Sequence, residues 1–109
     1  MNKVLIAAFA LTLGTMAGQS MAQDADPAAK AKEICAACHG EDGNKSVTPD
    51  IPKLGGQPAD YLAKALHDYQ AGKRKNPIMA AMASTLTKDE VKALARYFSK
   101  QTSELHVLY

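Results

Sequence analysis

The sequence predicts an all-α fold: one small domain of about three main helices joined by loops. Three segments carry helix caps or apolar residues at helical spacing, and the stretches between them are rich in Gly, Pro, Asp and Asn. No internal repeat or low-complexity segment interrupts this pattern. A chain of 109 residues builds only a marginal apolar core unless a cofactor or a cross-link supports it.

The first helix is expected to begin at Asp26, a good N-cap that is followed by Pro27 at the first helical position. Ala28, Ala31 and Cys35 lie along one face at helical spacing. These small side chains let another helix approach closely, so we expect this face to contact the C-terminal helix. The helix ends at the segment Cys-Ala-Ala-Cys-His, residues 35–39.

Residues 40–57 are expected to form a structured loop, because they open with the turn signal Asp-Gly-Asn and contain two prolines. A second helix is predicted from Pro58 to about Ala71, with Gly72 just past its end. Its apolar stripe is expected to pack on the loop or on a bound group: Tyr61, Leu62, Ala65, Leu66 and Tyr69.

Residues 73–77, Lys-Arg-Lys-Asn-Pro, break the helical pattern and are expected to lead into a loop that carries Met79 and Met82. A third helix begins with a capping box formed by Thr87 and Glu90. The apolar residues that follow repeat at helical spacing to about Lys100: Val91, Leu94, Ala95 and Phe98.

The segment from Cys35 to His39 has the spacing through which proteins attach haem covalently. Two thiols at this spacing can each add across a vinyl group of the porphyrin, and His39 then lies under the iron as a proximal ligand. Covalent attachment keeps a large apolar cofactor in a very small domain. The sequence therefore predicts one haem c, attached through Cys35 and Cys38, with His39 as an iron ligand.

A thioredoxin-like redox pair and half of a zinc site are the alternatives for these cysteines. A thioredoxin motif follows a strand in a βαβ unit, whereas the residues before Cys35 are helical in composition. A structural zinc site usually needs four ligands, and the chain has two cysteines. The remaining ligands would be His67 or His106, neither of which stands at zinc-finger spacing.

Residues 1–22 have the pattern of a cleaved export signal. A lysine precedes a short apolar run, and Ser20 and Ala22 are small residues at the two positions that a signal peptidase reads. An uncleaved membrane anchor is the alternative, but glycines interrupt the run well short of about 20 apolar residues. We expect a mature domain of residues 23–109 and a periplasmic location.

The net charge of the mature chain indicates which kinds of partner it can bind. Without Lys3, the mature chain has 12 basic and 11 acidic residues. Such near-neutrality argues against nucleic acid as a partner. No further stretch is apolar enough to span a membrane, so we expect no membrane span in the mature chain.

A six-coordinate haem that carries electrons needs a second axial ligand, and a thioether is the choice that raises the reduction potential. The mature chain offers Met79 and Met82, both downstream of His39 and between two helices. A methionine in such a segment usually fills a packing gap. Both methionines therefore stay open as candidates, and His67 and His106 are weaker alternatives, because solvent-facing histidines are far commoner than ligands.

A larger set of residues carries a family resemblance: Cys35 to Gly40, Asp42 to Asn44, Pro52 to Gln57, Tyr61, Leu62, Leu66, Tyr69, Gly72, Arg74, Met79, Leu86, Asp89 and Ala95 to Phe98. With these residues the chain resembles the class I c-type cytochromes. It is similar to the small bacterial periplasmic single-haem type, and thus to one half of the dihaem periplasmic cytochromes. The resemblance covers nearly all of residues 23–109 and implies a small cytochrome c fold wrapped around one covalently attached haem.

The resemblance also implies roles for single residues. In the family the ligating methionine stands seven residues before the leucine that opens the last helix, here Leu86, which selects Met79. The carbonyl of Pro52 is implied to accept the Nδ1 proton of His39, and Leu54 is implied to pack on the porphyrin. Candidates for lining the pocket or meeting the haem propionates are Tyr61, Tyr69 and Arg74.

The function implied by the resemblance is periplasmic one-electron transfer, without catalysis, between respiratory donors and acceptors. The expected partners are an oxidase, a quinol-oxidising complex or a dehydrogenase, met by a monomer in transient complexes. The basic cluster of residues 73–75 is a candidate docking patch. Two other functions stay open: a haem protein that binds a ligand or peroxide, and the haem subunit of a larger exported dehydrogenase, to which the apolar tail of residues 104–109 would dock.

Overall fold

The computed structural model describes Ala10, Gly14 and residues 26–103, and this described part consists of helices and loops. The helices in chain order are α1 (Pro27–Lys30), the π-helical turn η1 (Ala31–Cys35), α2 (Ala36–His39), α3 (Ala59–Gln70), α4 (Pro77–Ser84) and α5 (Lys88–Ser99). The predicted all-α fold is thereby confirmed. The remainder of the predicted export signal and residues 104–109, with His106, lie outside the described residues.

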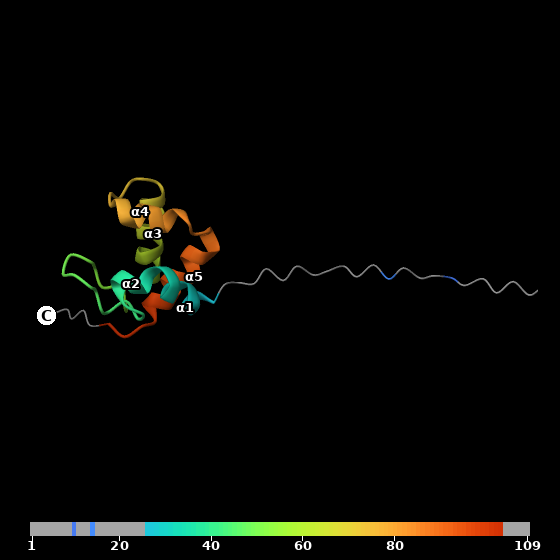
Figure 1. The fold of residues 1–109 in the computed structure, drawn as a ribbon, viewed down its shortest axis with the longest axis horizontal. Coiled ribbons are helices and arrows are strands. Elements are labelled where there is room, and N and C mark those ends of the chain that lie inside the picture. Colours follow the sequence, from blue (N-terminus) through green and yellow to red (C-terminus); the bar gives the residue numbers. More distant parts are fainter. Residues whose placement is uncertain (1–9, 11–13, 15–25, 104–109) are drawn as a thin grey trace, which may run out of the picture.

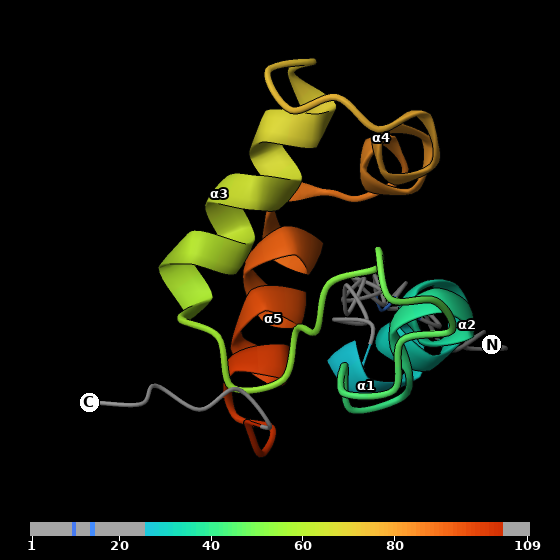
Figure 2. The same ribbon diagram turned by 90° about the vertical axis from the view of Figure 1, so that its left-hand side faces the viewer.

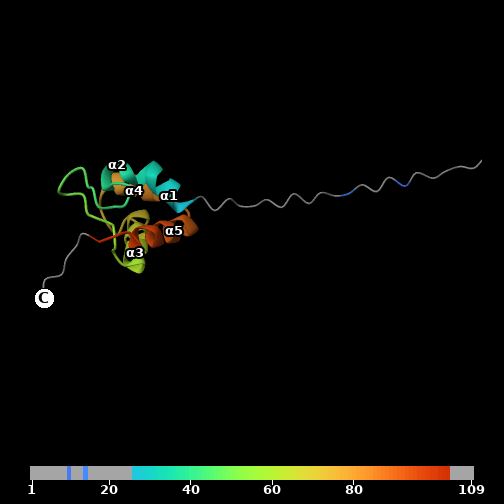
Figure 3. The ribbon, with the colours of Figure 1, turned by 90° about the horizontal axis from the view of Figure 1, so that it is seen from below.

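The helices form two layers. α3 and α5 pack side by side, and α1, α2 and α4 all lie on the same side of this pair (Figures 2 and 3). Figure 1 shows that the loop of residues 40–58 extends away from α2 and then returns to the start of α3. None of the helices within residues 26–103 has both the length and the apolar character needed to cross a membrane.

The core lies where α5 meets α1 and α3. The capping box predicted for α5 is present: Thr87 Oγ1 accepts from the Glu90 amide at 3.1 Å, and Glu90 Oε2 accepts from the Thr87 amide at 2.8 Å. The predicted apolar face of α5 supplies four of the seven buried residues of the core cluster, which are Ala31, Leu62, Leu86, Val91, Leu94, Ala95 and Phe98.

The predicted contact between the first helix and the last one is present. Of the two alanines on the predicted face, Ala31 is fully buried in the core, whereas Ala28 is exposed. The chain from Ala31 to Cys35 forms the π-helical turn η1, which has more residues per turn than an α-helix. The ion pair between Lys30 and Glu90, 3.5 Å from Nζ to Oε1, also joins α1 to α5.

The segment that carries the two methionines is a helix, so the prediction of a methionine-bearing loop is wrong. Asn76 caps α4, because its Oδ1 accepts from the amides of Ile78 and Met79, both at 3.0 Å. Pro77 occupies the first helical position. An N-cap residue followed by proline also predicted the start of α1 at Asp26. The sequence therefore signals the start of α4 in the same way.

Candidate haem-binding site

His39 closes α2 and is buried, with 5% of its surface exposed. Its Nδ1 lies 2.8 Å from the carbonyl oxygen of Pro52 and donates a hydrogen bond to it. In a neutral ring this bond places the proton on Nδ1 and leaves the lone pair on Nε2, which is the form that binds a metal. The hydrogen bond implied by the resemblance is thus present in the fold.

Cys35 and Cys38 are free thiols, both half-buried, and stand one helical turn apart just before His39. Burial raises the pKa of the Cys35 thiol to about 11. A thioredoxin-like pair needs the opposite shift, because its attacking cysteine works as a thiolate. The environment of Cys35 therefore disfavours the redox-pair alternative and suits a thiol that is consumed in a thioether bond.

The loop after His39 folds back onto the cysteine motif. The amide of Lys45 donates to the carbonyl of His39 at 3.2 Å, and that of Val47 donates to the carbonyl of Cys38 at 3.0 Å. Gly40 makes this return possible: its φ is +85°, and an added Cβ would lie 2.8 Å from the Lys45 nitrogen. These main-chain bonds, together with the bond from His39 Nδ1 to the Pro52 carbonyl, hold the loop against the helix end that carries the histidine.

The same loop is attached to the far end of α5. Gly43, buried with φ +80°, accepts from the Leu54 amide at 2.8 Å, and an added Cβ would lie 2.9 Å from Phe98 Cδ1. Asn44, 5% exposed, donates from Nδ2 to the carbonyl of Thr102 at 2.6 Å. These contacts place Leu54, half-buried, beside the core. Asn44 was predicted only as a turn residue, and nothing local in the sequence indicates its bond to Thr102.

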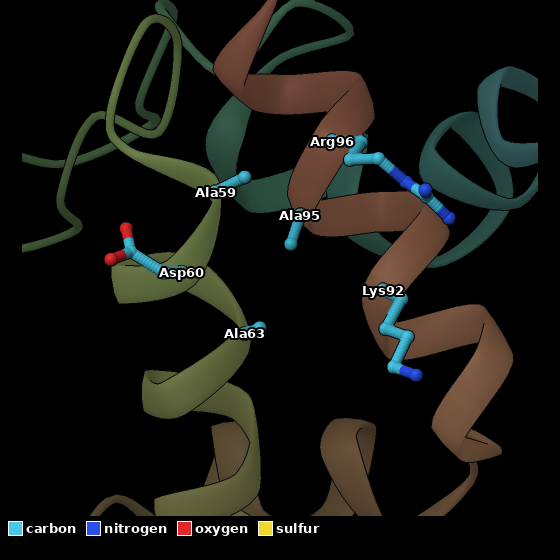
Figure 4. A pocket seen from close by; sticks show the side chains of 6 residues that line it. All are labelled: Ala59, Asp60, Ala63, Lys92, Ala95 and Arg96. Atoms are coloured by element: carbon cyan, nitrogen blue, oxygen red, sulfur yellow. The ribbon is translucent and has the colours of Figure 1, made fainter.

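Two hollows lie among the described residues, one inside the loop and one between α3 and α5. A hollow of about 420 Å³ lies inside the loop and is lined by residues 44–49 and 51–53, including Pro52. A second, of about 220 Å³, lies between α3 and α5, with alanines on its floor and Asp60, Lys92 and Arg96 at its rim (Figure 4). The described residues that line these two hollows include no Cys, His or Met, so neither hollow by itself marks a haem site.

The two candidate methionines differ in burial. Met79 is half-buried, whereas Met82, one turn further along α4, is 41% exposed. Their helix lies on the same side of the α3–α5 pair as α2, which carries His39 (Figures 2 and 3). Burial therefore distinguishes the two methionines, whereas the position of their common helix does not.

The three polar candidates for the pocket interact with one another along α3: Tyr61 is in its first turn, Tyr69 is in its last turn and Arg74 follows the helix. Arg74 donates from Nη1 to the hydroxyl of Tyr61 at 3.4 Å, and its guanidinium stands 5.2 Å from the ring centroid of Tyr69. Tyr61 itself is 48% exposed, so it does not lie on the buried side of the predicted stripe, whereas Leu62 of the same stripe is buried. The three side chains form a polar cluster at the surface.

His67 has a different partner from the one a metal site requires. Its Nδ1 lies 3.0 Å from Oε1 of Gln70 on the same exposed face of α3. Within the described part of the chain, no three His, Cys, Asp or Glu side chains gather in a metal-binding arrangement. The zinc-site alternative for the cysteines therefore has no support among these residues.

Comparison with known proteins adds a family. A family model described as cytochrome c matches residues 25–102. Cytochrome c4 of Pseudomonas aeruginosa is 40% identical over 101 residues, which is 93% of this chain and 49% of that protein. The thiosulfate dehydrogenase electron acceptor of Thiomonas intermedia is 42% identical over 66 residues, 61% of this chain and 30% of that protein.

A third relative is the cytochrome subunit of sulfide dehydrogenase from Chlorobaculum tepidum, 36% identical over 72 residues, which cover 66% of this chain and 64% of that subunit. The chain spans about half the length of the cytochrome c4 relatives that it matches. The residue set of the site and the family match agree. This chain belongs to the cytochrome c family, resembles one half of a dihaem cytochrome, and carries covalent haem c at its Cys-Ala-Ala-Cys-His segment.

Proposed function

We propose that this protein is a periplasmic one-electron carrier whose haem is attached through Cys35 and Cys38 and ligated by His39 and Met79. The observation that carries the proposal is the 2.8 Å hydrogen bond from buried His39 Nδ1 to the Pro52 carbonyl. It orients the ring and leaves Nε2 as the electron-pair donor, directly after the two thiols.

The residues around the site each have a task in this function. Bound haem supplies a one-electron ferric–ferrous couple. The Pro52 carbonyl makes His39 a stronger donor, as outer hydrogen-bond partners of metal-binding histidines do. The thioether of Met79 favours the ferrous state and so raises the potential. Leu54 supplies apolar contact from the loop, and the cluster of Tyr61, Tyr69 and Arg74 is suited to meet a propionate carboxylate.

Partner binding is proposed at the start of α4. Ile78 and Met82 present apolar side chains to solvent, 65% and 41% exposed, next to the basic residues 73–75. An apolar patch beside positive charge suits a small, transient contact with an acidic redox protein. One relative is named as an electron acceptor of a thiosulfate dehydrogenase and another as the cytochrome subunit of a sulfide dehydrogenase, which supports a dehydrogenase as the donor here. A quinol-oxidising complex and an oxidase are the other expected partners.

The absorption spectrum of the purified haem protein, oxidised and reduced, with and without carbon monoxide, tests the proposal. We expect a long-wavelength band from sulfur-to-iron charge transfer in the ferric protein and a ferrous spectrum that carbon monoxide leaves unchanged. Met79→Ala removes the band and admits carbon monoxide, whereas Met82→Ala, the matched change one turn away, leaves both unaltered. A wild-type protein that lacks the band and binds carbon monoxide readily contradicts the proposal and favours a ligand-binding haem protein.

A further inference from the structure

We propose that Gln70 is a positioning residue for Met79: its side-chain amide pins the end of α4 to α3 and so holds the methionine where it can bind iron. This inference rests on the proposed function. It assigns a role to a residue that belongs neither to the haem-attachment segment nor to the axial ligands.

The geometry of the amide is the first step. Nε2 of Gln70, the last residue of α3, donates to the carbonyl of Ala83 at 2.8 Å and to the carbonyl of Leu86 at 3.1 Å. Ala83 stands in the last turn of α4, and its carbonyl also accepts from the Leu86 amide at 3.1 Å. Leu86 lies in the short connection to α5. One side chain therefore joins α3 to both the end of α4 and the turn that follows it.

The orientation of this amide is itself held. His67 Nδ1 lies 3.0 Å from Gln70 Oε1 and donates to it from the preceding turn of α3. Because the oxygen is engaged by the histidine, the nitrogen of the same amide faces the two carbonyls. His67, which sequence reasoning weighed as an alternative iron ligand, thus serves the positioning of a different ligand.

The effect reaches Met79 through the helix. Met79 and Ala83 are one turn apart on α4, and Ala83 is fully buried. A helix of eight residues is marginal without packing, so its position depends on what holds its two ends. Asn76 closes the first end locally, and Gln70 ties the second end to a neighbouring helix. Loss of the second tie lets α4 shift or fray while the rest of the fold stays intact.

Competition by imidazole for the ferric iron measures this role directly in the holoprotein. Gln70→Glu keeps the size of the side chain but turns its two donated bonds into repulsion between oxygens. We expect imidazole to bind about tenfold more tightly, equal to about 1.4 kcal/mol, with weakening of the sulfur-to-iron band. Gln70→Arg retains donors that can reach two carbonyls and is expected to keep the wild-type affinity.

Gln101→Ala is the matched control, because it removes another glutamine whose Nε2 donates to a backbone carbonyl, that of Tyr97 at 3.0 Å. It is expected to leave imidazole affinity unchanged, and Met79→Ala sets the upper limit. Should Gln70→Glu fail to fold, Gln70→Ala takes its place, with an expected smaller shift in the same direction. An affinity equal to wild type in the Gln70 variant, in a protein that shows the band, overturns this inference alone; a wild-type protein without the band overturns the proposed function instead.

Discussion

The two sides of the site are held by different means. The histidine side, residues 35–57, is held largely by main-chain hydrogen bonds and by glycines with positive φ, and His39 is 5% exposed. The methionine side, residues 70–86, is a short helix held at its ends by the side-chain amides of Asn76 and Gln70. The first arrangement tolerates few changes of backbone, whereas the second can be adjusted by single side chains. With the proposed ligation by His39 and Met79, this contrast makes the histidine side rigid and the methionine side tunable.

The largest effect is expected at Gly43. Gly43→Ala forces a Cβ to 2.8 Å from Leu54 Cβ and 2.9 Å from Phe98 Cδ1, in a residue with φ +80°. Overpacking and the left-handed backbone together predict a loss of about 3 kcal/mol in the free energy of unfolding. Denaturant unfolding of the holoprotein measures this loss.

Gly72→Ala is the control for the backbone contribution, because Gly72 also has a positive φ, +72°, but has nothing within 4 Å of an added Cβ. We expect a loss of about 1 kcal/mol there. Equal losses in the two variants would mean that the close approach at Gly43 relaxes freely, and the description of the proximal side as rigid would be wrong.

Removing the N-cap of α1 or that of α4 compares the histidine side with the methionine side. Asn76→Ala and Asp26→Ala each remove an N-cap, from α4 and α1 respectively, and each is expected to cost about 1 kcal/mol of stability. Asn76→Ala alone is expected to weaken the sulfur-to-iron band and tighten imidazole binding, because α4 carries Met79. A similar spectral change in Asp26→Ala would remove the distinction between the sides.

A smaller effect is expected from the charges beside α4. Reversing Lys73 and Lys75 to Glu is expected to slow reduction of ferricyanide, an anionic oxidant, by a few-fold at low salt and much less at high salt. Lys92→Glu, on the rim of the separate hollow in Figure 4, reverses one charge away from α4 and measures the effect of net charge per reversal. The docking proposal fails if the rate and its salt dependence in the double variant equal those of the Lys92 variant.

The smallest effects concern two aspartates whose pKa values are both lowered from 3.8. The backbone amide of Asn44 lowers the pKa of Asp42 on the histidine side, and the ammonium of Lys64 lowers the pKa of Asp68 on α3. A lowered pKa means that each group stabilises the fold above its ordinary pKa, and this contribution is lost as the pH falls through the lowered value.

The dependence on salt distinguishes the two causes of the lowered pKa values, a backbone hydrogen bond at Asp42 and a lysine at Asp68. Titration of both carboxyl groups by NMR is expected to show the pKa of Asp68 rising toward 3.8 at high salt, because its partner is an exposed lysine, while that of Asp42 moves less. An equal salt response at the two aspartates would contradict the view that main-chain bonds dominate on the histidine side.

Local signals in the sequence predicted much of the fold. The capping box of α5, the cap of α1 and the extent of α3 all depend on residues within one or two turns, and each is present. The start of α4 was missed although Asn76 and Pro77 signal it, because the preceding basic run was interpreted as the beginning of a loop. The π-helical turn before Cys35 has no sequence signal that we recognise.

The sequence by itself determined the chemistry of this protein: two thiols and a histidine at a spacing that accepts haem, in an all-α chain of the cytochrome c family. Only the tertiary structure decided which methionine is half-buried, why Arg74 meets Tyr61 and Tyr69, and where Gln70 donates its bonds. The physical reason is the separation along the chain of the residues that interact. A motif or a cap depends on a few neighbouring residues, whereas the bonds of Gln70 to Ala83 and Leu86 exist only once α3 and α4 have packed together.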